Sequence, residues 1–217
     1  MTEPITAGQF HAAEGVEDWR ALYTGVSAHF RTGSFSTGVA LVEVIGRLAD
    51  AADHHPDVDL RYGGLTVRLV THSVQGLSDR DVALAQQISA AARELGVAAD
   101  PAAVQDVEVA IDVLDLSAVR PFWLAVLGYR EAAGRDYLVD PHGRWPTIWF
   151  QQMDEPRPQR NRVHVDICVP HDEAQTRIAA AVAAGGRLVS AEHAPSWWVL
   201  ADPEGNEACV ATWQGRD

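Results

Sequence analysis

The first half of the chain shows a helical hydrophobic period followed by a strand period. Between Phe35 and Ala52 apolar residues recur at helical spacing, at Leu41, Val44, Ile45 and Leu48. This spacing is typical of an amphipathic helix. Ser34 or Ser36 is suited to cap the start of this helix. From Leu65 to Leu69 apolar and polar residues alternate, which predicts a half-buried strand.

A second helix is predicted to begin after Ser78. Ser78 is a typical N-cap residue, and Asp81 occupies the acidic position of a capping box. The apolar stripe of this helix consists of Leu84, Ile88, Ala91 and Leu95. The first half therefore has an α+β pattern, in which helices pack on one face of a small antiparallel sheet.

The second half predicts the order β-α-β-β-β twice. The first copy has a strand at Val107–Leu114, a helix within 115–129, and strands near Tyr137–Val139 and Thr147–Gln152. The second copy has a strand at Arg162–Val169, a helix within 172–186, and strands near Arg187–Ser190, Trp197–Leu200 and Glu207–Thr212. We place a domain boundary near residues 97–104, which predicts one domain over 1–98 and another over 104–217.

Composition narrows the classes of function. The net charge is −13, with 17 basic and 30 acidic residues and no cluster of Lys or Arg, which disfavours nucleic-acid binding. No apolar run reaches the ~20 residues of a membrane helix, and the first residues lack the pattern of a signal peptide. With only Cys168 and Cys209, the sequence favours a cytoplasmic protein without a disulfide framework.

Three histidines flank the segment that contains the Gly63-Gly64 pair. A two-residue turn at this pair predicts a hairpin whose register sets His55 opposite His72, with His54 beside them. Directly opposed Cβ atoms lie roughly 5 Å apart. Adjacent histidines on an extended chain point in different directions, so acid–base chemistry is favoured over a metal site. The alternatives are that these histidines only end a helix and a strand, or that a bulge at Pro56 shifts the register.

The same residues carry a family resemblance over roughly residues 16–95. His54-His55-Pro56, an aromatic at Tyr62, Thr71-His72 and the segment Gly76-Leu77-Ser78-Asp79-Arg80-Asp81 resemble the pterin-4a-carbinolamine dehydratase family, as do Trp19 and the Phe30–Phe35 spacing. The resemblance implies a hydro-lyase that dehydrates a 4a-hydroxytetrahydropterin, such as 4a-hydroxytetrahydrobiopterin, to the quinonoid dihydropterin without a cofactor. It also implies a homo-oligomer.

The resemblance assigns roles to the matching residues. His54 and His72 become the acid–base pair, His55 binds and orients the pterin, and Asp81 either holds His72 or serves only as the capping-box acid. Pro56, Tyr62 and Thr71 are implied to contact the substrate. Val58 and Leu60 depart from the family, which often has an aromatic residue at the first position and a polar residue at the second.

The second half resembles the glyoxalase-like branch of the vicinal-oxygen-chelate superfamily, over roughly residues 104–213. The paired β-α-β-β-β units, the "RVHVDICV" strand and the "DPEGNEACV" turn and strand carry this resemblance, which implies a cup-shaped sheet. Glu108, His164 and Glu207 are weak candidates for metal ligands, and Cys209 stands where a ligating glutamate is expected. We therefore expect no metal, and a small-molecule ligand whose identity stays open.

Two further questions stay open from the sequence. Trp149, Trp197 and Trp198 either line an aromatic pocket or fill the core.

The leading function is pterin dehydration with a small-molecule-binding second domain. The alternatives are a non-catalytic binding or dimerisation protein, and a metal-dependent lyase or dioxygenase of the second domain.

Overall fold

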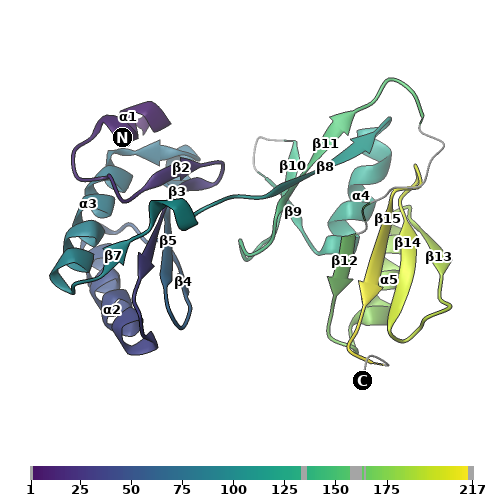
Figure 1. Cartoon of the computed structure of the whole chain (residues 1–217). Coiled ribbons are helices and arrows are strands. Elements are labelled where there is room, and N and C mark those ends of the chain that lie inside the picture. The colour runs from purple at the N-terminus through teal and green to yellow at the C-terminus, as the bar shows by residue number, and fades with distance from the viewer. Residues whose placement is uncertain (1, 133–135, 157–162, 164, 215–217) are drawn as a thin grey trace. The chain divides into compact units, whose positions relative to one another are not determined.

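The computed structural model describes residues 2–132, 136–156, 163 and 165–214. The chain separates into two compact units, Met1–Asp106 and Val107–Asp217 (Figure 1). Among the described residues, no helix has the length and apolar character needed to cross a membrane.

The first unit is built on an antiparallel sheet with the strand order β2-β3-β5-β4. These strands are β2 (Arg20–Leu22), β3 (Gly25–Arg31), β5 (Leu65–Leu69) and β4 (Asp57–Leu60). The short strand β7 (Ala98–Ala99) also pairs with β3, and the first unit extends to Asp106. A second small sheet joins β1 (Pro4–Ile5) to β6 (Leu77–Ser78).

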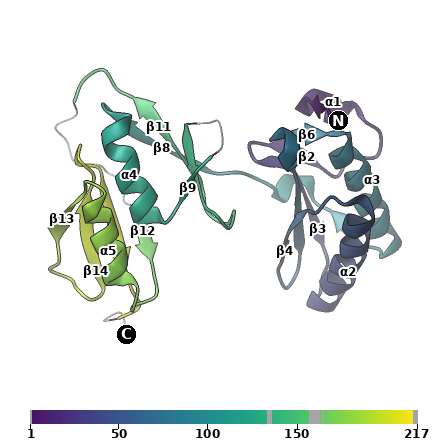
Figure 2. The same ribbon diagram turned by 180° about the vertical axis from the view of Figure 1, so that it is seen from behind.

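Helices cover one face of this sheet, as the sequence predicted (Figure 2). They are α1 (Ala7–Ala12), α2 (Phe35–Ala52) and α3 (Asp79–Glu94), with short 3-10 turns at His72–Val74 and Pro101–Ala103. Helix α2 has the predicted bounds, and the Ser34 side chain caps its start. The inward-facing residues of β3 and β5 pack with α2 and α3 in one fully buried core that includes Phe30, Leu65, Leu41, Leu84 and Ile88.

The predicted register of the hairpin is wrong. The β4–β5 pairing sets Leu60 opposite Leu65 and Asp57 opposite Arg68, a shift of two residues from the prediction. Four residues form the loop, closed by the Arg61 N–H donating to the Gly64 carbonyl at 2.8 Å, and neither glycine of the pair has a positive φ. A shift of two keeps each side chain on its face, so Leu65 still points into the core, but His55 does not face His72 across the sheet.

The second unit confirms the repeated β-α-β-β-β order. The first copy contains β8 (Glu108–Val113), α4 (Leu116–Leu127), β9 (Arg130–Glu131), β10 (Tyr137–Val139) and β11 (Thr147–Gln152). The second contains β12 (Val165–Cys168), α5 (Ala174–Ala183), β13 (Arg187–Ser190), β14 (Trp197–Ala201) and β15 (Glu207–Ala211). In each four-stranded sheet the first strand pairs in parallel with the last, and the remaining pairs are antiparallel.

Equivalent aspartates stabilise the turn before the last strand of each copy. Asp140 accepts hydrogen bonds from the backbone N–H groups of His142, Arg144 and Trp145. Burial raises the pKa of Asp140, but these three N–H groups outweigh it, so its pKa lies below the ordinary value. Asp202 is fully buried and accepts from Trp123 Nε1 at 3.0 Å, which ties the turn of the second copy to helix α4 of the first.

Candidate functional site

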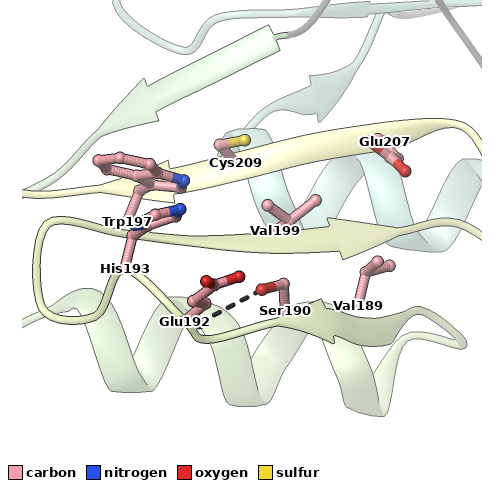
Figure 3. Close-up of a pocket in the computed structure, with 8 residues that line it drawn as sticks. All are labelled: Val189, Ser190, Glu192, His193, Trp197, Val199, Glu207 and Cys209. Atoms are coloured by element: carbon pink, nitrogen blue, oxygen red, sulfur yellow. Dashed lines mark hydrogen bonds between the residues drawn. The ribbon is translucent and has the colours of Figure 1, made fainter.

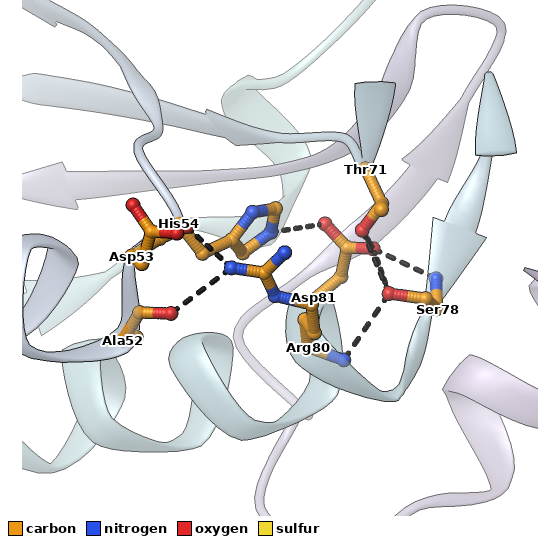
Figure 4. A network of polar contacts seen from close by, with 7 residues as sticks. All are labelled: Ala52, Asp53, His54, Thr71, Ser78, Arg80 and Asp81. Atoms are coloured by element: carbon orange, nitrogen blue, oxygen red, sulfur yellow. Dashed lines mark hydrogen bonds and ion pairs between the residues drawn. The ribbon is translucent and has the colours of Figure 1, made fainter. Parts of the chain in front are cut away.

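The carboxylate of Asp81 is the centre of a buried polar network in the first unit (Figure 4). Its Oδ1 lies 2.8 Å from Nε2 of His54. Its Oδ2 accepts from the Thr71 hydroxyl at 2.6 Å and from the Ser78 backbone N–H at 2.7 Å. Asp81 is 0% exposed and His54 only 6% exposed. The bonds within the network therefore replace the hydrogen bonds to water that both side chains lose on folding.

Local sequence explains why Asp81 occupies this position. Ser78 is the N-cap of α3, and Asp81 completes the predicted capping box by accepting from the Ser78 N–H. The positive end of the helix dipole also favours a carboxylate there. Asp81 therefore has both roles: its Oδ2 caps the helix, and its Oδ1 bonds to His54.

Arg80, the neighbour of Asp81, holds the chain segment that leads into His54. Its Nη2 donates to the carbonyl oxygen of Ala52 at 3.0 Å and to that of Asp53 (Figure 4). Asp53 ends helix α2 in the left-handed conformation, with φ at 47°. The first turn of α3 thus fixes both the backbone before His54 and the His54 imidazole.

His55 and His72 are exposed neighbours of this network. The His55 side chain is 60% exposed, and its Nε2 lies 3.1 Å from Oδ1 of Asp50. His72 follows Thr71 directly and begins a 3-10 turn. Because Asp81 bonds to both His54 and Thr71, it brings the two histidine-bearing segments together, which the hairpin register does not do.

The structure also shows where Asp81 and the residues expected to contact the substrate lie. The described hydrogen bonds of Asp81 include none to His72, and the expected contact between them is replaced by the bond to His54. The Thr71 hydroxyl is used inside the network, because it bonds to Asp81 and lies 2.7 Å from the Ser78 hydroxyl. Tyr62 lies 78% exposed in the loop at the far end of the hairpin from the histidines. Pro56 lies half-buried between His55 and β4.

The two departures from the family pattern, Val58 and Leu60, have different surroundings. Val58 is 38% exposed on the edge strand β4. Leu60 packs against the core at Gly38, where an added Cβ would lie 2.3 Å from Leu60 Cδ1. An apolar residue at position 60 thus has a packing role.

Sequence reasoning did not find Asp50 and Arg80 as parts of the site. The sequence singled out Arg80 only as part of the segment 76–81 that resembles the family. Asp50 lies five residues before its partner His55, which follows the end of helix α2 at Ala52, so helical spacing did not indicate this pair.

The second unit contains an open pocket of about 500 Å³ on strands β13, β14 and β15 and the loop between β13 and β14 (Figure 3). Trp198 and Leu200 of β14 belong to the core, so Trp197 and Val199 lie on the opposite face, which forms the pocket. This alternation answers the question of the tryptophans in the second copy: Trp198 packs and Trp197 lines the pocket. Trp149 is half-buried on β11.

In the part of the chain that the structure describes, no group of three or more His, Cys, Asp or Glu side chains is arranged to hold a metal ion. Glu108 is exposed at the start of β8, and Glu207 lines the pocket on β15. Cys209 is 5% exposed and also lines the pocket. His164 lies outside the described residues.

The fold and the network in the first unit define an α+β domain with a histidine–carboxylate site. The sequence model of the family described as pterin 4 alpha carbinolamine dehydratase matches residues 3–91. A protein of Nocardia farcinica, assigned by name to these dehydratases, is 39% identical over 82 residues, which are 38% of this chain and 86% of that protein. A relative from Aquifex aeolicus, also assigned to them by name, is 32% identical over 82 residues, which are 38% of this chain and 83% of its own length. The chain belongs to the pterin-4-alpha-carbinolamine dehydratase family.

The second unit has matches of its own. The sequence model of the glyoxalase-like domain matches residues 108–211. Among solved structures, a glyoxalase/bleomycin resistance protein/dioxygenase family enzyme from Burkholderia phytofirmans covers 50% of this chain and 98% of its own, with 22% identity and a TM-score of 0.41. Another solved structure carries the dehydratase name that matches the first unit: a transcriptional coactivator/pterin dehydratase from Brucella melitensis covers 42% of this chain and 99% of its own, with 25% identity and a TM-score of 0.39.

Proposed function

We propose that the first unit dehydrates a 4a-hydroxytetrahydropterin, with tetrahydrobiopterin as the expected pterin, and that the second unit binds a small molecule. The observation that carries this proposal is the Asp81 carboxylate, which joins His54 to the segment bearing His72. Family membership supports the reaction class.

The reaction needs proton transfers at two places on one substrate. The bond from C4a to its hydroxyl oxygen breaks, and the oxygen takes a proton and leaves as water. The neighbouring ring nitrogen loses its proton, and a C=N double bond forms. Electrons are only rearranged within the pterin, so the proposal assigns no oxidant, reductant or metal to this step.

Histidines suit both transfers because imidazole gives or takes a proton near neutral pH. A carboxylate oxygen accepts hydrogen bonds, so Nε2 of His54 carries a hydrogen toward Asp81 and Nδ1 is the nitrogen that exchanges a proton. In the proposal His72 is the second member of the acid–base pair, and exposed His55 binds the pterin beside it. Asp50 orients the His55 ring.

The test is the rate at which freshly generated carbinolamine becomes the quinonoid pterin, followed by absorbance. The purified full chain should accelerate this step, and His72→Ala should lower kcat by about 10²-fold, the usual contribution of one acid–base group. His54→Ala should cause a loss of similar size. His171→Ala changes an exposed histidine of the second unit and should leave the rate unchanged. No acceleration by the wild-type chain, or full activity in His72→Ala, would refute the proposal.

A further inference from the structure

A short closed loop presents His72. At its base the Thr71 N–H donates to the Gly76 carbonyl at 2.8 Å, and the Thr71 hydroxyl donates to Asp81 (Figure 4). Inside the loop the Gln75 N–H donates to the His72 carbonyl at 3.1 Å. Residues joined across a turn in this way have Cα atoms within about 7 Å of each other. The backbone of Gln75 is therefore fixed beside the proposed acid–base residue.

Gln75 has a backbone conformation that glycine usually provides. Its φ is 49° and its ψ is 40°, in the left-handed region. Among the described residues, a positive φ is found at eight glycines and at only two other residues, Asp53 and Gln75. Aspartate is one of the residue types that tolerate this region, whereas glutamine is not. Glycine would avoid the steric cost of a Cβ atom at position 75, so the backbone alone does not explain a glutamine there.

The contacts of Gln75 do not explain its side chain either. Gln75 is exposed, and the hydrogen bonds described for it involve only its backbone. Both non-glycine residues with a positive φ adjoin a histidine of the site, because Asp53 directly precedes His54 and Gln75 follows His72 by three positions. Strained backbone of this kind concentrates at catalytic and binding sites, where a particular side chain is needed. The carboxamide of Gln75 is therefore a candidate for contact with the substrate.

The chemistry of a carboxamide selects one edge of the pterin ring. A carboxamide has an acceptor oxygen and a donor nitrogen, so it forms two reciprocal hydrogen bonds with a lactam, which is a ring N–H beside a carbonyl group. The pterin has this edge at N3 and C4. The C4 atom is bonded directly to C4a, the carbon that loses its hydroxyl in the proposed reaction. A residue one turn away from His72 is thus close enough to bind the lactam while His72 acts at C4a.

We propose that Gln75 is a specificity-determining residue of the first unit, and that its carboxamide binds the N3–H and the C4 carbonyl of the pterin. This inference rests on the proposed function, because it needs His72 to act at the neighbouring C4a. Gln75 then selects the ring that is bound, and the histidines carry out the proton transfers.

The first test compares the stability and kinetics of the full-length chain. Gln75→Gly relieves the backbone strain, so the midpoint of urea denaturation of the first unit should rise. The same variant loses two neutral hydrogen bonds to the substrate, so KM for the carbinolamine should increase about tenfold, with a smaller change in kcat. Gln75→Glu keeps the length of the side chain but cannot donate to the C4 carbonyl, and it should also raise KM. Gln87→Glu makes the same change at an exposed position of helix α3 and should leave KM unchanged.

The second test measures which edge of the ring is bound. Calorimetric titration of wild type and Gln75→Gly uses pterin and 3-methylpterin, whose methyl group replaces the N3–H. Wild type should bind pterin about tenfold more tightly than 3-methylpterin. In Gln75→Gly the two affinities should become nearly equal.

Opposite changes in stability and KM distinguish a binding role from a structural one. If the wild-type chain accelerates dehydration, an unchanged KM or a lower stability in Gln75→Gly overturns the role of Gln75 and leaves the proposed function in place. An unaltered preference for pterin over 3-methylpterin in this variant does the same. A wild-type chain that neither accelerates dehydration nor binds pterin overturns both.

Discussion

Nε2 of His54 lies 2.8 Å from Oδ1 of Asp81, and this bond is buried between the end of one helix and the start of another. The other oxygen of the same carboxylate accepts from the Thr71 hydroxyl. A side chain placed by helix capping therefore also sets the position of two histidine-bearing segments. Helix stability and the proposed acid–base site depend on the same residue.

The two adjacent histidines should differ in their effect on stability. His54→Ala leaves the buried Asp81 carboxylate without its imidazole partner and should lower the free energy of unfolding by about 3 kcal/mol. His55→Ala removes an exposed side chain and should change it by less than about 0.5 kcal/mol. Urea denaturation of both variants measures this difference. Equal effects would contradict the burial of the His54–Asp81 pair.

Arg80 is predicted to be a positioning residue for the histidines. Arg80→Ala removes the hydrogen bonds to the last carbonyl groups of α2, which should cost about 1–2 kcal/mol of stability. It should also lower kcat several-fold while KM changes less, because His54 follows the released carbonyls directly. Arg47→Ala removes an exposed arginine from the middle of α2 and is the matched control. If Arg80→Ala lowers stability without changing kcat, the role of Arg80 is structural only.

Two glycines of helix α2 should respond oppositely to the same substitution. Gly46 faces open space, so Gly46→Ala should stabilise the first unit by about 0.5–1 kcal/mol through helix propensity. At Gly38 an added Cβ would lie 2.3 Å from Leu60 Cδ1, so Gly38→Ala must displace Leu60 and should destabilise the unit by about 1–3 kcal/mol. Thermal unfolding of both variants provides the comparison. Stabilisation by both would show that Leu60 does not pack there.

Asp140 should make the stability of the second unit depend on pH. Its pKa is depressed below 3.8 because backbone N–H bonds outweigh burial, so its stabilisation is present above the ordinary pKa and is lost as the pH falls through the folded value. Asp140→Asn should therefore lower the melting temperature of this unit at pH 7, and the difference from wild type should shrink below about pH 4. A difference that stays constant from pH 7 to pH 3 would contradict this role.

Local patterns in the sequence predicted much of the fold. Helix α2 was predicted from the spacing of Leu41, Ile45 and Leu48 and from the cap at Ser34. The start of α3 was predicted from its capping box. These features depend on residues within one turn of each other. The repeated order in the second unit was also visible, because each strand and helix has its own period. The central strand β3 was not predicted, although Val26, Ala28 and Phe30 alternate as a strand requires.

Long-range contacts account for what the sequence could not show. Gly64 suggested a tight turn, but the His29 ring packs against it, at 2.5 Å from the position of an added Cβ. The bond from Asp81 to His54 spans 27 positions, and no local pattern indicates it. The hairpin register does not set His55 opposite His72, and the segments that bear His54 and His72 are joined instead through the Asp81 carboxylate. Capping of α3 places this carboxylate.

The most direct measurement of the central claim is the rate of carbinolamine dehydration by Asp81→Asn beside Asp79→Asn. Both aspartates lie in the first turn of α3, but Asp79 is exposed and Asp81 is fully buried between His54 and Thr71. We expect folded Asp81→Asn to lose about tenfold or more in kcat, because one charge-assisted bond to the imidazole is removed, while Asp79→Asn keeps the wild-type rate. A folded Asp81→Asn variant that dehydrates the carbinolamine as fast as wild type would contradict the account.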